Sequence, residues 1–420
     1  MPDTLQPGVR LSVLPTDQFK TTRISVHFMA PLDPATISAR TLLTSLLETS
    51  SAEFPTQAAL SAELERMYGA DFGIGVNKDG QVHRLTATLS VVADRVAGTD
   101  LLRQAFAFLQ STLLHPLLPQ GQFDAATFAR ERENLVQYLA SLAEDRQTQA
   151  GLALQALYFA AEPKQAVPSF GTATAMAAVT PAQVLAAYHQ IITQDQILIT
   201  VLGPVDPAAV RELAAGLGFA ARSADSLTVS VDRPVSESVA AKRDEAPVVQ
   251  AKLNLGYHVD TDIYGPQFYA ASVASALFGG SPLSLLFTNV REKASLAYYA
   301  SSVLDPLRHF MMVQTGIDTA TAPRVAALIA EQLRLVQTGE FSADLLANVK
   351  QGMLTSRLMA YDSPRFLARQ ALLRSLVPGV PADYDSYAQA IGAVDRAAVM
   401  AAAQGMTLQA QYLLAGKESQ

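Results

Sequence analysis

Apolar residues along this 420-residue chain follow two spacings, which predict strands and helices in a regular order. In residues 8–30 apolar and polar residues alternate, as they do in half-buried strands. In residues 36–48 the apolar residues fall three and four apart, as they do on the inner side of a helix. Residues 71–76 and 82–91 predict two further strands, because an Asp-Gly pair between them supplies the positive φ of a tight hairpin.

Helical periodicity dominates the rest of the first half, which closes with one strand and a short helix. We expect helices at 57–68 (with Thr56 as its N-cap), 99–114, 123–143, 147–159, 181–190 and 207–217, and a strand at 196–202.

The same order of elements then returns, so the chain is predicted to contain a duplicated domain with a period of roughly 210 residues. Strands are expected at 248–257, 295–304, 310–317 and 409–414, and helices at 267–277, 282–290, 322–338, 343–361, 364–376, 384–391 and 395–404. The predicted fold class is α+β, with two tandem homologous halves that each place helices over a mostly antiparallel sheet.

The predicted domains are 1–222 and 248–420. Residues 223–247 are rich in Ser, Asp, Arg and Lys and poor in large apolar residues, so they are interpreted as a linker, with one exposed strand at 227–231.

Composition narrows the function classes. The formal net charge of -7 argues against a nucleic-acid partner, which would require a basic surface. With no Cys, disulfides, thiolate metal sites and Cys nucleophiles are excluded. The N-terminus has no signal-peptide pattern, and no apolar run approaches the ~18 residues of a membrane span, so we expect a soluble cytoplasmic protein.

The segment 277–299, LFGGSPLSLLFTNVREKASLAYY, is the most informative part of the chain. Its Gly-Gly pair is interpreted as a turn that avoids a Cβ penalty, followed by Ser281 as an N-cap and Pro282 as the first helical residue. Arg291 and Tyr298 then fall at the two ends of a helix-turn-strand corner. Spacing alone leaves two interpretations open: a surface Arg with a half-buried Tyr, or two side chains that point into one space.

The order Gly-Gly, short amphipathic helix, then R-E-K-x-x-L-A-Y resembles the C-terminal half of the pitrilysin/insulinase family of zinc peptidases, the inverted zincins. The resemblance implies a processing-peptidase-like metallohydrolase fold. It also implies that Arg291 and Tyr298 bind the backbone of a peptide substrate. The sequence departs from the family pattern at Ser295, where a Gly is usual.

Zinc-dependent peptide hydrolysis in such a family requires H-x-x-E-H on a helix, and this chain has no pair of His at that spacing. By the resemblance, the two His fall near Leu42 and Leu46, the Glu near Ser45, and the third ligand near Gln137 or Tyr138. None of these side chains replaces the missing donor set. No catalytic residue and no metal ligand are therefore predicted, and zinc is expected only in a partner subunit.

The remaining candidates for chemistry are weak. Glu48 is the only carboxylate close to the lost motif, and it is expected to face solvent near a helix end. His27 and His83 lie in early strands and are expected to be isolated. Nucleotide-binding glycine motifs and a G-x-S-x-G elbow are absent from the sequence.

The resemblance implies an inactive peptidase-family subunit, not an enzyme on its own, that binds peptide and forms a heterodimer with an active zinc-peptidase relative. One alternative is a non-enzymatic peptide-binding or scaffold protein, a homodimer that assists modification of a cytosolic protein. Another is a hydrolase with an unrecognised site.

Overall fold

The computed structural model describes residues 2–231 and 233–416, which form two compact units. Unit 1 comprises the chain up to Ala140, Val167–Thr228 and Ser363–Leu376, and unit 2 comprises Ser141–Ala166, Val229–Asp362 and the chain from Val377. Each unit therefore includes a segment from the other half of the sequence. The predicted domains 1–222 and 248–420 divide the chain in sequence order. The two units do not test that division, so it stays a prediction.

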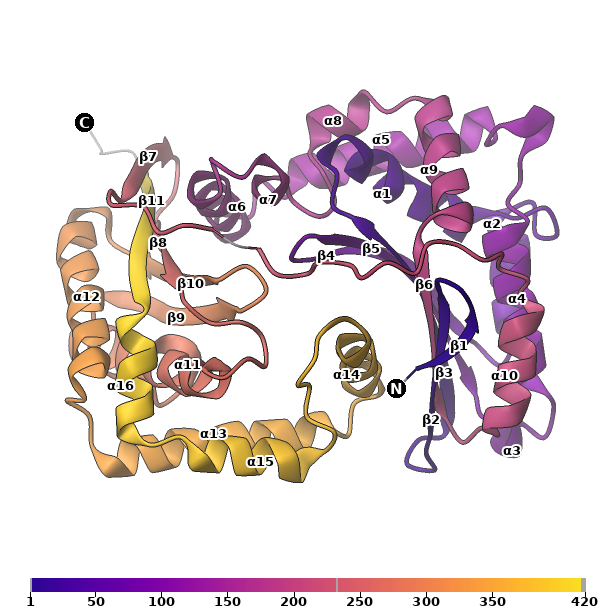
Figure 1. Ribbon diagram of the computed structural model, residues 1–420. Helices are drawn as coiled ribbons and strands as arrows, with labels where there is room; N and C mark the ends of the chain where they lie inside the picture. Colours follow the sequence, from indigo (N-terminus) through magenta and orange to yellow (C-terminus); the bar gives the residue numbers. More distant parts are fainter. Residues whose placement is uncertain (1, 232, 417–420) are drawn as a thin grey trace. The chain divides into compact units, whose positions relative to one another are not determined.

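Unit 1 contains a six-stranded sheet with the strand order β1-β2-β6-β3-β5-β4 (Figure 1). The pairs are antiparallel except β2 with β6. Its elements are β1 (Asp3–Gln6), β2 (Val9–Pro15), β3 (Thr21–Pro31), α1 (Pro34–Thr49), α2 (Gln57–Arg66), β4 (Asp71–Asp79), β5 (Val82–Val92), α3 (Asp94–Ala97), α4 (Leu101–Leu114), η1 (Pro119–Gly121), α5 (Ala125–Ser141, ending one residue into unit 2), α8 (Ala173–Ala177), α9 (Pro181–Thr193), β6 (Gln196–Gly203), α10 (Pro207–Gly216) and α14 (Pro364–Leu376).

Unit 2 contains a five-stranded sheet with the order β7-β11-β8-β10-β9. Its elements are α6 (Arg146–Tyr158), α7 (Pro163–Ala166), β7 (Ala240–Ala246), β8 (Ala251–Val259), α11 (Phe268–Ser275), η2 (Ala276–Gly280), η3 (Leu286–Lys293), β9 (Ala297–Asp305), β10 (Phe310–Ile317), η4 (Thr319–Thr321), α12 (Ala322–Thr338), α13 (Ala343–Ala360), α15 (Tyr384–Ala393), α16 (Arg396–Gln404) and β11 (Met406–Gly416). Across the described ranges, every helix is too short or too polar to cross a bilayer.

The two sheets repeat one topology. The strand order β2-β6-β3-β5-β4 in unit 1 corresponds to β7-β11-β8-β10-β9 in unit 2. In both sheets the first pair of strands is parallel and each following pair is antiparallel. The predicted α+β class, with two halves that each cover a mostly antiparallel sheet with helices, is confirmed. Within residues 2–231 and 233–416, β1 is the one strand without a counterpart in unit 2.

This topology corrects the interpretation of the linker. The segment 227–231 forms no strand; near its end the backbone N of Val231 donates to the carbonyl of Leu307. A strand forms instead at β7, where Ala240–Ala246 pairs in parallel with Ala410–Gly416. Its sequence AAKRDEA is polar because β7 lies at the sheet edge and buries little.

Residue alternation gives the sheet of unit 1 two different faces. Along β3, Ile24, Val26 and Phe28 are fully buried and belong to the apolar core. The alternate residues Arg23, Ser25 and His27 must point to the opposite face, because successive strand side chains alternate. One face therefore packs on helices such as α1 and α4, and the other is polar.

Each sheet is also covered by one helix that comes from the other half of the sequence. In unit 1, α14 packs on β6. In unit 2, α6 packs on β8 and β11, and its Leu154 and Tyr158 form a separate cluster with Tyr412 and Leu414. Both helices directly follow a long helix, α5 or α13, so they occupy equivalent places in the two halves.

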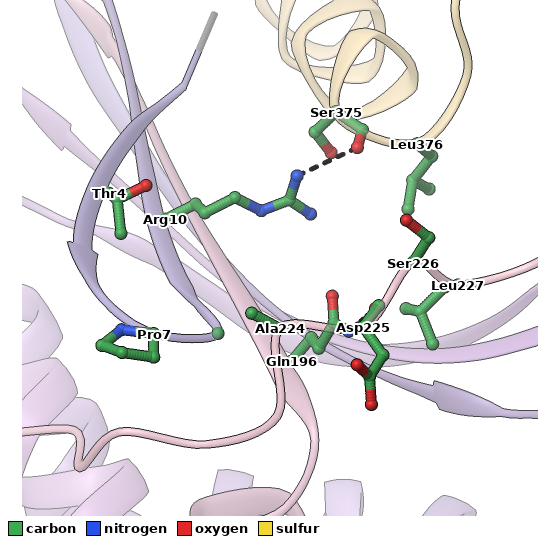
Figure 2. Close-up of a pocket in the computed structure, with 11 residues that line it drawn as sticks. Thr4, Pro7, Arg10, Gln196, Ala224, Asp225, Ser226, Leu227, Ser375 and Leu376 are labelled. Atoms are coloured by element: carbon green, nitrogen blue, oxygen red, sulfur yellow. Dashed lines mark hydrogen bonds between the residues drawn. The ribbon is translucent and has the colours of Figure 1, made fainter.

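Arg10 fixes the end of α14 to the sheet of unit 1. Its Nη1 donates to the carbonyl of Ser375 at 3.0 Å, beside a small cavity of about 190 Å³ (Figure 2). An Arg bound to a terminal helix carbonyl satisfies an acceptor that the helix itself leaves free.

A buried charged network, which sequence reasoning missed, joins α1 to the sheet. Arg40 Nη2 donates to Asp195 Oδ2 at 2.6 Å, and Arg40 Nε donates to Nδ1 of His83 at 3.0 Å. The ring proton of His83 therefore lies on Nε2, which donates to the Ser169 carbonyl at 2.9 Å. Burial first, and then the charge of Arg40, lower the pKa of His83 to about 4.

We predict that His83 makes the stability of the protein depend on pH. In the unfolded chain its pKa is about 6.5, so between that value and about 4 the unfolded state binds the extra proton. The free energy of unfolding should fall as the pH drops through this window, by on the order of 3 kcal/mol from His83. Urea unfolding of the wild type and of His83→Gln at pH 7 and 4.5 measures this; equal pH dependence in the two proteins would contradict it.

Candidate functional site

The segment that follows α11 is built differently from the predicted helix. α11 ends at Ser275, a π-helical turn covers Ala276–Gly280, and a π-helix, η3, covers Leu286–Lys293. The expected N-cap at Ser281 is wrong: its buried Oγ has no hydrogen-bond partner, and the next helix begins only at Leu286. Ser284 instead accepts from the backbone N of Phe287 at 3.3 Å. π-Helical segments often accompany functional sites because they re-aim side chains.

Gly279 is required for close packing and not for a turn. It lacks a positive φ, which corrects the reason given for the Gly-Gly pair. A Cβ at Gly279 would lie 2.6 Å from Cδ1 of Leu286 and 2.9 Å from the backbone N of Ser302 on β9. The glycine therefore lets the π-turn approach both η3 and β9, the two elements that carry the predicted site residues.

Arg291 lies on η3 and is exposed. Its guanidinium carbon is 4.6 Å from the centroid of the Phe287 ring, four residues earlier. Such a cation–π contact holds the guanidinium over an apolar surface while its N–H groups remain available to donate. The structure thus supports an exposed donor at this position.

Tyr298 lies on β9, the last strand of its sheet, with 65% of its surface exposed. Gly316 pairs with Tyr299 and Ile317 with Ala297, so Tyr298 is the extra residue of a β-bulge. Bulges at sheet edges commonly re-aim a side chain. The neighbouring Tyr299 turns back to its own unit and donates to Oε1 of Gln147.

Ser295, where the sequence departs from the family pattern, has φ +52°. This left-handed conformation explains the usual glycine, since a side chain is strained there. Its Oγ donates to the carbonyl of Glu292 at 3.3 Å and so stabilises the turn between η3 and β9.

The helix that resembles the zinc-binding helix of the family is part of the apolar core. Leu42 and Leu46 are buried, and Ser45 is half-buried. Gln137 and Tyr138 lie on the exposed side of α5, where Gln137 Nε2 donates to Glu133 at 2.8 Å. These positions offer no ligand set for zinc.

Glu48 does not face solvent, contrary to the expectation. It is half-buried at the end of α1, and its Oε1 accepts from the backbone N of Ile74 on the edge strand β4. Burial raises the pKa of its carboxyl, and the Ile74 hydrogen bond only partly opposes this effect. Glu48 thus fastens α1 to the sheet edge.

His27 and His83 lie on opposite faces of the sheet. His83 contacts Arg40 on the helix side, whereas Nδ1 of His27 is 3.0 Å from Thr86 Oγ1 on the polar face. Because residues 83 and 86 of β5 point to opposite sides, the two rings do not share a ligand site.

Among the residues that the structure describes, one group of side chains has metal-ligand chemistry; it lies in unit 2, and sequence reasoning missed it. Donor atoms of His258, Asp260 and His309 all lie within 4.8 Å of one another. Nε2 of His309 also lies 3.2 Å from Oδ1 of Asp262 and 3.3 Å from Oγ of Ser230. The strand ends of β8 and β10 bring them together, and His-x-Asp after a strand was the only available sequence signal.

A family model and a similar protein of known sequence both describe inactive peptidases. A family model described as "Peptidase M16 inactive domain" matches residues 178–353. The Bacillus subtilis (strain 168) protein "Probable inactive metalloprotease YmfF" is 28% identical over 419 residues, which cover 98% of this chain and 96% of that protein.

Among solved structures, a conserved protein from Enterococcus faecalis V583 is 37% identical, with a TM-score of 0.95, and the match covers 100% of this chain and 99% of that one. A peptidase M16 inactive domain from Pseudomonas fluorescens matches with a TM-score of 0.81 at 17% identity, again over 100% and 99% of the two chains. At that identity the likeness shows the fold alone.

We predict that Gly279→Ala lowers the free energy of unfolding by about 1–3 kcal/mol, because the added methyl group forces η3 and β9 apart. The matched control is Gly352→Ala in α13, where a Cβ meets no other atom within 4 Å; its stability should stay equal or rise by up to about 1 kcal/mol. Thermal and urea unfolding measure both, and equal effects of the two substitutions would refute the packing role of Gly279.

Proposed function

The chain belongs to the M16 family of pitrilysin/insulinase-type peptidases and lacks its zinc motif, and from this premise we propose that it is a peptide-binding subunit that pairs with a zinc-bearing relative. The observation that carries the proposal is the exposed edge strand β9, with Tyr298 on its bulge and Arg291 on the adjoining π-helix.

An edge strand offers backbone groups to an added strand. In the part of the chain that the structure describes, β10 is the one strand that pairs with β9, and β9 exposes Tyr298 and Val303. An extended peptide binds such an edge through backbone hydrogen bonds, and side chains beside the edge give selectivity. The exposed Tyr and Val supply apolar contact area for the bound peptide.

Arg291 supplies hydrogen bonds of a different kind. A guanidinium presents five N–H donors in a fixed fork, which suits peptide carbonyls and carboxylates. Stacking on Phe287 reduces the freedom of the side chain before a ligand arrives. Arg291 and Tyr298 are thus assigned to substrate binding and not to bond cleavage.

The pairing follows from what α1 lacks. Leu42, Leu46 and Ser45 offer neither imidazoles nor a carboxylate base, so a relative with the intact motif is required for peptide turnover. In this arrangement one chain activates water and the other holds the peptide. Cofactor binding by this chain is not part of the proposal.

We predict that Arg291→Ala and Tyr298→Ala each weaken peptide binding roughly tenfold, the effect of losing one good hydrogen bond or aromatic contact. The protein is isolated from its native cells, the co-purifying zinc peptidase is identified, and turnover of a fluorogenic peptide by the pair is measured. Arg103→Ala, which removes an exposed arginine from α4 of unit 1, is the matched control and should leave turnover unchanged.

Unchanged turnover with Arg291→Ala and Tyr298→Ala, in chains that remain folded, would show that the assigned residues are wrong. Absence of any co-purifying zinc peptidase would reject the pairing. In that case a homodimer that holds peptide without cleavage, measured by light scattering, supports the alternative of a non-enzymatic binder or scaffold.

Bound zinc alone does not establish the hydrolase alternative, because His258, Asp260 and His309 form a group with metal-ligand chemistry outside the lost motif. The metal content must therefore be measured together with peptide turnover. Zinc near one per chain that disappears in His309→Ala, while peptide turnover by the pair persists, shows that the metal is not needed for catalysis. Zinc-dependent turnover by the isolated wild type would favour the hydrolase.

A further inference from the structure

A second candidate site lies in unit 1, on the polar face of its sheet. A cavity of about 750 Å³ separates strands β3, β5 and β4 from helix α14, and every residue that lines it belongs to unit 1. This volume is typical of small-molecule sites. We call it the polar cavity; its wall includes Arg23, Ser25, His27, Thr86, Arg365 and Arg369.

The floor of the polar cavity is open because of two glycines on β4. Gly73 and Gly75 pair with Thr88 and Thr86 of β5, and a Cβ at Gly75 would meet no atom within 4 Å. Neither glycine has a positive φ, so backbone conformation does not require them. Their effect is to leave space above a floor of hydroxyl groups.

The charges around this space are mostly positive guanidinium groups. Asp79 accepts from Arg84 at 2.7 Å and from Arg369 at 2.8 Å, so one carboxylate is shared by two cations. Arg369 Nη1 is buried and has no hydrogen-bond partner, and the same holds for Arg23 Nε. These N–H groups are donors without an acceptor.

Arg23 and Arg365 both line the cavity, and the charge of Arg365 acts on Arg23. Burial first, and then the like charge of Arg365, lower the pKa of Arg23, while Asp71 only partly compensates. Arg365 is exposed at the cavity wall. Two guanidinium groups around one space favour an anion between them.

His27 adds a neutral donor to the same wall. Only 5% of its surface is exposed, and burial keeps its pKa well below 6.5. Arg84 Nη1 donates to Thr86 Oγ1, whose own hydroxyl proton is available to donate to Nδ1 of His27. With that hydrogen bond the ring proton lies on Nε2, which is buried without a partner.

Three carboxylates line the cavity as well, and they do not satisfy these donors. Asp79 is already shared by two arginines, and Asp71 is exposed at the strand start. Glu48 already accepts from the backbone N of Ile74. Buried donors without a partner, on the two elements β3 and α14, therefore lie in the wall of the polar cavity.

We propose that the polar cavity binds an oxyanion, the carboxylate or phosphate group of a small ligand, through Arg23, Arg365, Arg369 and Nε2 of His27. The hydroxyl groups of Ser25, Thr86 and Thr88 form the floor on which the remaining polar part of the ligand lies. This site shares no residue with the peptide-binding site proposed at Arg291 and Tyr298, so the proposal does not depend on the proposed peptide-binding function.

Isothermal titration calorimetry of the full chain with inorganic phosphate and with succinate, at constant ionic strength, tests the proposal. One saturable site per chain is expected for at least one of the two probes, and the tighter probe identifies the anion class. Arg23→Gln and Arg365→Gln should each weaken that probe roughly tenfold or more, the effect of losing a charge-assisted hydrogen bond.

Two further variants test whether a loss of binding comes from the cavity itself, and not from a change in net charge or from unfolding. Gly75→Leu keeps every charge but fills the floor, and since a Cβ there has free space the chain should fold and lose binding. Arg103→Gln removes an exposed charge from α4, which packs on the helix side of the sheet, and should bind as the wild type does. Saturable binding that persists in Gly75→Leu, equal losses in Arg103→Gln and Arg365→Gln, or no saturable binding of either probe would overturn the proposal.

Discussion

The alternation of side chains along β3 and β5 is the constraint on which unit 1 depends. Because successive residues point to opposite faces, the sequence that buries Ile24, Val26 and Phe28 must also place Arg23, Ser25 and His27 on the other face. A slip of one residue would exchange the two faces and bury arginine among the core helices. The apolar core and the polar cavity are thus two consequences of one register.

Helix α1 is held in the fold by apolar packing and polar contacts, although it lacks the zinc ligands of the family that it resembles. Residues near the positions of zinc ligands, Leu42 and Leu46, are buried aliphatic side chains, and burial of each contributes about 1.5–3 kcal/mol to folding. The helix is fixed to the sheet by Arg40 with Asp195, and by Glu48 with the backbone of Ile74. Its packing therefore does not need a metal ion.

The duplicated topology explains why a helix from each half is needed by the other. Each sheet has its own helices on one face, and the second face is covered in part by α14 in unit 1 and by α6 in unit 2. The two coverings differ in chemistry. Under α6 an apolar cluster with Tyr158 and Tyr412 fills the space, whereas under α14 the lining is polar and a cavity remains.

The local sequence determined most elements, because helical and strand periodicities and the Thr56 cap are set by near neighbours. It also determined the absence of a zinc motif, and its R-E-K-x-x-L-A-Y segment singled out Arg291 and Tyr298. It missed β7, since a polar edge strand carries no apolar pattern, and the π-helices, since they depend on how Gly279 packs against β9.

Only the tertiary structure decided which distant residues meet. Arg40 reaches Asp195 across 155 positions, and Arg369 reaches Asp79 across 290, and neither spacing leaves a trace in the sequence. The same holds for His258 with His309 and for the cavity under α14. Contacts of this kind arise from sheet order and from the exchange of helices between the halves, which are set by the burial of whole faces and not by any local run of residues.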